Sequence, residues 1–224
     1  MKGNKKSNKR KNISTVMEIL IKEFSKKRKP TVRKISQKRD PFKVLISCLL
    51  SLRTRDENTA LAASRLFHYV KKPEDLVKMP LKKIENLIYP SGFYKKKART
   101  LREVALTLIK KFKGKVPNTK KELLSIKGIG QKTANIVLSF AYKKAVLPID
   151  THCHRIPNRL GWVKTAKPEQ TEKELEKILP KKYWREFNTV MILFGRTICL
   201  PLSPLCSKCP IRKYCKRIGV KKSR

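Results

Sequence analysis

The chain has 224 residues, with 57 Lys and Arg against 16 Asp and Glu, and a net charge of +41. The positive charges on such a basic surface repel one another unless a polyanion binds there, and nucleic acid is therefore the expected partner. A ribosomal or membrane-surface protein is the alternative class. Apolar residues make up 40% of the chain, which argues against a disordered basic protein. Its apolar runs are too short to span a bilayer, and no apolar segment of a secretory signal is found at the N-terminus. We therefore expect a cytoplasmic, nucleoid-associated protein.

The sequence pattern near the N-terminus changes at residue 13. Residues 1–12 are basic and poor in apolar side chains, which predicts a disordered arm that adds attraction for phosphate. From residue 13 the apolar positions recur on one face of a helix. They are Ile13, Val16, Met17, Leu20, Ile21 and Phe24. Residues 26–39 then form a basic connector.

The rest of the chain predicts helices only. Asp40-Pro41 provides a helix N-cap followed by proline at the first helical position. No segment has the alternating pattern of a strand, so the fold class is all-α. Further helices are expected at about 56–69, 81–88, 93–112, 120–126 and 131–142, from 150, and at 168–179 and 183–198.

The segment LLSIKGIGQKTA, residues 123–134, predicts a helix–hairpin–helix. Gly128 and Gly130 would let the backbone turn sharply and approach another chain, with Ile129 anchoring the turn. The amides at the start of the second helix would then face a DNA phosphate, and Lys127 adds a cation beside them. The alternative is an ordinary helix–helix turn with glycine as the C-cap. The high positive charge favours the DNA-binding interpretation.

Two residues are candidates for catalysis. Lys132 follows the hairpin turn, where neighbouring cations and the positive helix end destabilise its ammonium form and favour a nucleophilic amine. A solvated surface lysine is the ordinary alternative. Asp150 follows the apolar stretch LPI and precedes an expected helix, so it is first of all an N-cap, a role compatible with catalysis. His152 and His154 are expected to be structural, and no role is assigned to Cys153.

Four cysteines, Cys199-x6-Cys206-x2-Cys209-x5-Cys215, are spaced to meet at one metal centre. Tetrathiolate sites hold either zinc or an iron–sulfur cluster. One tight pair flanked by two single cysteines differs from the paired C-x-x-C of most zinc modules. Cys48 lies in an apolar helical run and is expected to be a buried thiol.

The order of hairpin, Lys132, Asp150 and cysteine cluster resembles the endonuclease III family of DNA glycosylases. The resemblance covers residues 13–217 and includes the motifs LLSIKGIGQKTANIVLSFAY and LPIDTHCHRIPNRLGW. It implies a two-domain helix-hairpin-helix glycosylase fold. One domain would be a six-helix barrel, residues 34–144, with the hairpin at about 120–142. The other, residues 13–33 and 145–224, would hold a [4Fe–4S] cluster on the four cysteines.

The resemblance also implies a function for individual residues. Lys132 matches the family's nucleophile and Asp150 its catalytic aspartate. Arg53 and Phe93 align with side chains that fill the gap left by a flipped base, although Arg53 stands where relatives often have glutamine and Phe93 where they often have leucine. A core aromatic is the alternative for Phe93. Lys127 replaces a proline that is common in this hairpin.

We therefore expect a monomeric bifunctional DNA glycosylase and lyase. Its substrate would be double-stranded DNA carrying oxidised pyrimidines or abasic sites, which it would nick by β-elimination. A monofunctional glycosylase for mismatched or alkylated bases is the first alternative, and Lys132 weighs against it because such relatives commonly lack this lysine. A non-enzymatic DNA-binding protein with a structural metal site is the second alternative.

Overall fold

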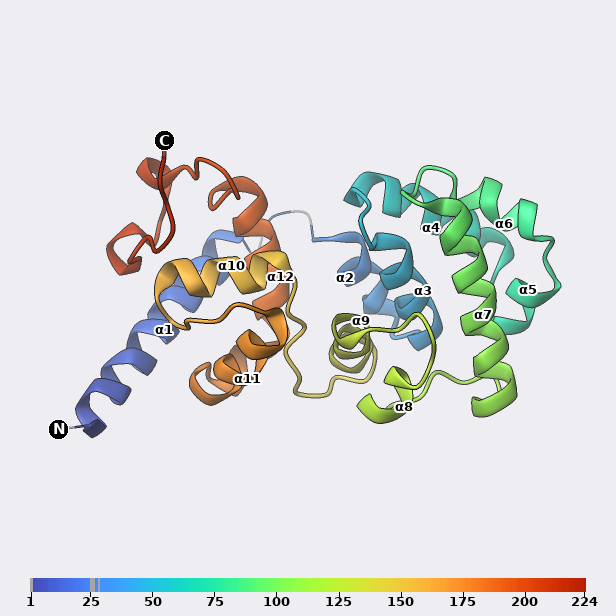
Figure 1. The fold of residues 1–224 in the computed structure, drawn as a ribbon, viewed down its shortest axis with the longest axis horizontal. Coiled ribbons are helices and arrows are strands. Elements are labelled where there is room, and N and C mark those ends of the chain that lie inside the picture. Colours follow the sequence, from blue (N-terminus) through green and yellow to red (C-terminus); the bar gives the residue numbers. More distant parts are fainter. Residues whose placement is uncertain (1, 25–26, 28) are drawn as a thin grey trace. The chain divides into compact units, whose positions relative to one another are not determined.

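The structure is a computed structural model that describes residues 2–24, 27 and 29–224; residues 1, 25, 26 and 28 lie outside it. The chain divides into two compact units (Figure 1). Unit 1 consists of Met1–Lys29 and Ala145–Arg224, and unit 2 of Pro30–Lys144. The described residues contain helices and turns but no strand, so the all-α prediction is confirmed.

Helix α1, Lys2–Phe24, begins unit 1 and corrects the prediction of a disordered arm. Its expected apolar face is buried: Ile13, Val16, Met17 and Leu20 are fully covered. Once residues 13–24 are held by this packing, extending the helix toward the N-terminus avoids the cost of nucleation. Lysine and arginine also have good helix propensity, which explains how the basic segment can be helical.

The core of unit 1 forms where α1 packs on α12, Trp184–Thr197, and α12 packs on α10, Thr151–Leu160. The Phe24 and Phe194 rings meet edge to face with centroids 6.0 Å apart. Helix α11, Pro168–Ile178, packs on α10. Helix α10, which begins directly after Asp150, is thus packed on both α12 and α11.

Unit 2 is built around α3, Pro41–Ser51. Asp40 caps this helix as expected: its carboxylate accepts a hydrogen bond of 3.0 Å from the Lys43 amide. Eight of the eleven residues are buried, and the helix packs on neighbours on several sides, which explains its nearly continuous apolar sequence. The neighbours include α4, Asp56–Tyr69, α7, Tyr94–Phe112, and α9, Gln131–Ile136.

Other helices of unit 2 are short. Helix α6, Leu81–Ile88, and α8, Lys120–Leu124, lie where expected. Helices α5, Pro73–Lys78, and α2, Thr31–Ile35, are not among the helices predicted from the sequence. Residues 30–33, predicted to belong to the domain of the two termini, lie in unit 2. Their anchor is a contact distant in sequence, because the Thr31 amide donates to the Asp56 carboxylate at 3.0 Å.

Candidate active site

The hairpin of unit 2 has the expected helix–turn–helix form. Thr119 caps α8 by accepting from the Glu122 amide, and the turn then leads through Gly130 into α9. Ile129 is buried, as predicted for the anchor of the turn. Lys127, Gly128 and Gly130 are exposed and available for an external partner. Helix α9 continues into a π-helical turn, Val137–Ala141, that is buried throughout.

The two hairpin glycines differ in what they require. Gly128 has φ of +95°, and a Cβ there would lie 2.8 Å from the Thr100 methyl group. Gly130 has an ordinary extended backbone, and a Cβ there would meet nothing within 4 Å. Gly128 is therefore needed by the fold, whereas only an external partner would require glycine at Gly130.

Alanine at these two positions should affect different properties: protein stability at Gly128 and DNA binding at Gly130. Gly128→Ala should lower the free energy of unfolding by about 2–3 kcal/mol, because it combines left-handed strain with overpacking. Gly130→Ala should cost less than about 1 kcal/mol of stability but weaken DNA binding roughly tenfold, since the added methyl blocks close approach of a phosphate. Thermal denaturation and a DNA-binding titration measure the two effects. Equal DNA affinity for wild type and Gly130→Ala would exclude contact at Gly130.

Lys132 is the second residue of α9 and is partly exposed. The next residue, Thr133, is buried and lies 3.7 Å from the thiol of Cys48. Burial raises the pKa of Cys48, and the positive charge of Lys132 acts in the opposite direction. Cys48 is fully buried, as expected. The base of α9 is thus fixed against α3, and Lys132 extends from a rigid support.

Asp150 is the N-cap of α10, as the sequence predicted. Its Oδ1 accepts hydrogen bonds of 2.9 Å from the amides of His152 and Cys153, and the residue is only 8% exposed. The carboxylate is therefore held in one orientation by two backbone amides. Burial lowers the pKa of the nearby Arg155, and the negative charges of Cys199 and Asp150 partly offset this lowering.

Two arginines of α10 bind the loop that carries the first cysteine. Arg155 Nη2 donates to the Cys199 carbonyl at 2.7 Å. Arg159 donates to the Cys199 sulfur at 3.4 Å and to the carbonyls of Leu200 and Pro201 at 2.6 Å each. Sequence reasoning did not assign these arginines, although their spacing of four residues on one helix face was visible in RIPNR.

Both histidines have side-chain partners within unit 1. His154 Nδ1 lies 2.6 Å from the Thr171 hydroxyl. His152 Nδ1 lies 3.1 Å from Arg155 Nη2. Cys153 is fully buried in the core of unit 1.

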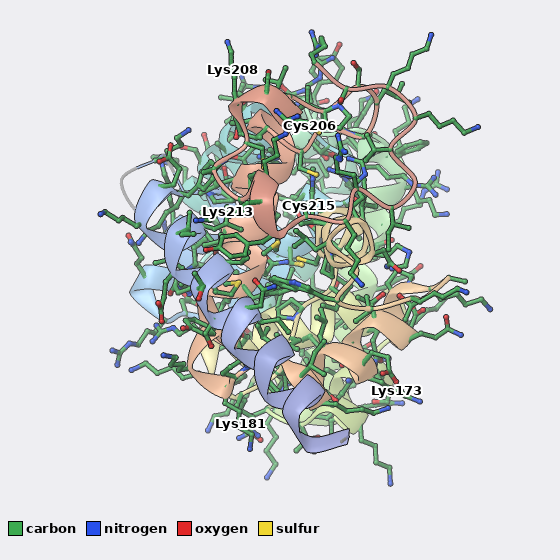
Figure 2. The ribbon with its side chains drawn as sticks, turned by 90° about the vertical axis from the view of Figure 1, so that its left-hand side faces the viewer. Lys173, Lys181, Cys206, Lys208, Lys213 and Cys215 are labelled. Atoms are coloured by element: carbon green, nitrogen blue, oxygen red, sulfur yellow. The ribbon has the colours of Figure 1, made fainter. Side chains whose placement is uncertain are left out.

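All four C-terminal cysteines line one pocket in unit 1. The pKa of Cys209 is raised to about 11, chiefly by burial and in smaller part by the charges of the other three cysteines, while a hydrogen bond from the Ile211 backbone acts in the opposite direction. Among the described residues, no three His, Cys, Asp or Glu side chains are arranged to hold a single metal ion. Figure 2 shows Lys208 and Lys213 on the same C-terminal segment as Cys206 and Cys215. Both lysines are exposed.

Arg53 and Phe93 come from two loops of unit 2. The Phe93 ring is 63% exposed, so its interpretation as a core aromatic is wrong. The Arg53 guanidinium lies 5.9 Å from the centre of that ring. Both residues line an open pocket that also includes Gly128 of the hairpin.

No helix in the described part of the chain is long and apolar enough to cross a membrane.

Comparison with known proteins identifies the family. Residues 46–181 match the model of the HhH-GPD superfamily of base excision DNA repair proteins. Over 204 residues the chain is 46% identical to endonuclease III of Thermotoga maritima, which covers 91% of this chain and 92% of the relative.

Solved structures agree with this assignment. A trapped covalent intermediate of endonuclease III with DNA is 33% identical, with a TM-score of 0.83 and coverage of 93% of this chain and 96% of that one. A thermostable thymine-DNA glycosylase is 27% identical, with a TM-score of 0.82 and coverage of 94% and 97%. The chain therefore belongs to the HhH-GPD superfamily of base excision DNA repair proteins and, within it, to the endonuclease III family of DNA glycosylases with lyase activity at abasic sites.

Proposed function

We propose that this enzyme removes oxidised pyrimidines from double-stranded DNA and nicks the strand through a Schiff base on Lys132. The observation that carries the proposal is the position of Lys132, partly exposed, directly after a hairpin turn in which Lys127, Gly128 and Gly130 are exposed. Family membership and the likeness to a trapped endonuclease III–DNA intermediate support it. The positive charge of the chain supplies attraction for the DNA backbone.

In this mechanism the damaged nucleotide first leaves the base stack, because its reacting carbon is otherwise inaccessible. The neutral amine of Lys132 forms a bond to C1′ while the glycosidic bond breaks and the base departs. Opening of the sugar ring gives a Schiff base. Loss of a C2′ proton then expels the 3′ phosphate, which leaves a nicked strand.

Asp150 has a separate role in the proposal. Its carboxylate stabilises the positive charge that develops on the sugar and assists the proton transfers. The two backbone amides that bind Oδ1 keep the carboxylate fixed before substrate arrives. Little reorganisation is then needed during the reaction.

Asp150→Asn and Asp150→Ala separate this catalytic role from capping. Asparagine caps a helix about as well as aspartate but carries no charge. Asp150→Asn should therefore lower the single-turnover rate of base release about 100-fold or more with little change in thermal stability. Asp150→Ala should show a similar rate loss and an additional cost of about 1 kcal/mol in stability. A rate for Asp150→Asn within about twofold of wild type would remove the charge from the mechanism.

We further propose that the four cysteines hold a [4Fe–4S] cluster with a structural role. All four cysteines line one pocket, and their spacing in the sequence, one C-x-x-C flanked by two single cysteines, differs from the paired C-x-x-C of most zinc modules. Membership of the endonuclease III family supports an iron–sulfur cluster at this pocket. When bound, the cluster would supply four iron–thiolate bonds that cross-link an irregular segment.

A second candidate substrate is a thymine in a mismatch. The likeness to a thermostable thymine-DNA glycosylase favours it specifically. Single-turnover assays on matched duplexes carrying thymine glycol, or thymine opposite guanine, separate the two. Faster release of the oxidised base supports the first proposal, and faster release of mismatched thymine supports the second.

A further inference from the structure

Lys97, on helix α7, lies between the two loops that carry Arg53 and Phe93. It is only 9% exposed. Its ammonium donates to the Leu50 carbonyl and to the Thr54 hydroxyl, both at 2.6 Å. A third hydrogen bond of 3.1 Å reaches the Ser91 hydroxyl. Leu50 and Thr54 flank Arg53, and Ser91 precedes Phe93, so one side chain joins both loops.

The three hydrogen bonds match the bonding capacity of the ammonium group, which has three donors. Burial lowers the pKa of Lys97 to about 8, so the charged form with all three donors still predominates at neutral pH. Its neighbours Lys95 and Lys96 are exposed to solvent. Burying a charge costs free energy unless it is hydrogen-bonded, and three protein oxygens meet this need at Lys97.

Thr54 connects the same two loops a second time. Its hydroxyl accepts from Lys97 and from the Gly92 amide, the latter at 3.1 Å, and donates to the Leu52 carbonyl at 3.2 Å. A hydroxyl has one donor and two acceptor positions, so all are used. The backbones also approach closely, because a Cβ on Gly92 would lie 2.8 Å from the Arg53 carbonyl oxygen.

The loops hold Arg53 and Phe93 in an uncommon backbone conformation. Arg53 has φ of +50° and Phe93 has φ of +59°. Residues other than glycine rarely have such φ values, and this backbone conformation persists where surrounding contacts stabilise it. The exposed Phe93 ring beside the Arg53 guanidinium cannot owe this geometry to core packing. The contacts that join the two loops beside these residues are those of Lys97, Thr54 and Gly92.

We propose that Lys97 is a positioning residue that fixes Arg53 and Phe93 as one rigid pair for opening the DNA base stack. The inference rests on the proposed glycosylase function. The three donors of the Lys97 ammonium are all taken by protein acceptors, so Lys97 acts by holding both loops. Loss of its hydrogen bonds should therefore impair the extrusion of a base from a paired duplex and spare the chemistry on a base that is already unpaired.

The test compares single-turnover base release from two duplexes with the same oxidised pyrimidine. In one duplex the lesion is paired, and in the other it lies in a three-nucleotide unpaired bubble. For Lys97→Met, the ratio of the paired rate to the bubble rate should fall at least about tenfold. Lys95→Met, which removes an exposed positive charge on the same helix, should leave the ratio unchanged.

Two further variants keep the test decisive. Thr54→Val removes the shared hydroxyl with little change of volume and should also lower the ratio of the paired rate to the bubble rate. This variant provides the test if Lys97→Met does not fold. In a chain lacking both side chains, Arg53→Ala with Phe93→Ala, adding Lys97→Met should change the ratio no further. A purely structural defect would instead lower both rates together.

The outcomes separate this inference from the proposed function. An active wild type whose ratio is unchanged in Lys97→Met, or in Thr54→Val if the former does not fold, overturns the positioning role alone. Equal loss of both rates in these variants also overturns it. A wild type inactive on both duplexes overturns the proposed function and the inference with it.

Discussion

Replacing Lys132 with alanine is expected to reduce strand nicking by at least about a thousandfold. The physical reason is that no Schiff base can form without the amine, so the 3′ phosphate cannot leave by this route. DNA affinity should stay within about threefold of wild type, because one cation in a chain of charge +41 is a small part of the attraction. Gel assays of nicking and a binding titration measure the two effects.

Lys127→Ala is the matched control for that change. Lys127 is an exposed lysine in the hairpin turn, five residues before Lys132. Its removal should weaken DNA binding modestly while nicking at saturating enzyme continues at the wild-type rate. If Lys132→Ala behaved like Lys127→Ala, with full nicking at saturation, Lys132 would not be the nucleophile.

Cys206→Ser should abolish cluster assembly and destabilise unit 1 by on the order of 4 kcal/mol. The segment after α12 has little packing to replace a cluster: of residues 200–224, only Pro204 and Ile211 are buried. Hydrogen bonds from Arg159 hold Cys199, Leu200 and Pro201, but not Cys206. Most of the segment should therefore lose its fixed conformation without metal.

Iron analysis, visible absorption and hydrogen exchange across residues 199–217 measure this effect without reference to activity. Cys48→Ala is the control, since it removes a fully buried thiol in unit 2 and should retain full iron content. Full iron in Cys206→Ser, with unchanged exchange in the segment, would refute this ligand assignment. Zinc in place of iron in wild type would refute the cluster itself.

Helices with strong local signals could be predicted from the sequence. The Asp40 cap, the apolar face of residues 13–24 and the glycines of the hairpin all act within a few residues, so the pattern alone locates them. Helix α2 lacks such a signal, because its first amide is satisfied by Asp56 from another helix. The N-terminal segment was misjudged because charge alone does not prevent extension of a helix that is already packed.

The candidate site was predictable only in part, for similar reasons. Lys132, Asp150 and the cysteines belong to compact motifs. The left-handed backbone of Arg53 and Phe93 has no sequence signal, since neither residue is glycine or asparagine. The contacts of Lys97 join segments that are distant along the chain. Arg155 and Arg159 likewise acquire their meaning only when the cysteine loop folds back onto α10.

The central claim is that Lys132 forms a covalent bond with the sugar of a damaged nucleotide. Borohydride reduction during reaction with a duplex carrying one oxidised pyrimidine tests it most directly, followed by mass spectrometry of the cross-linked peptide. The account predicts a stable protein–DNA adduct located on Lys132 and absent from Lys132→Ala. Release of the damaged base without any adduct, or an adduct on another residue, would contradict it.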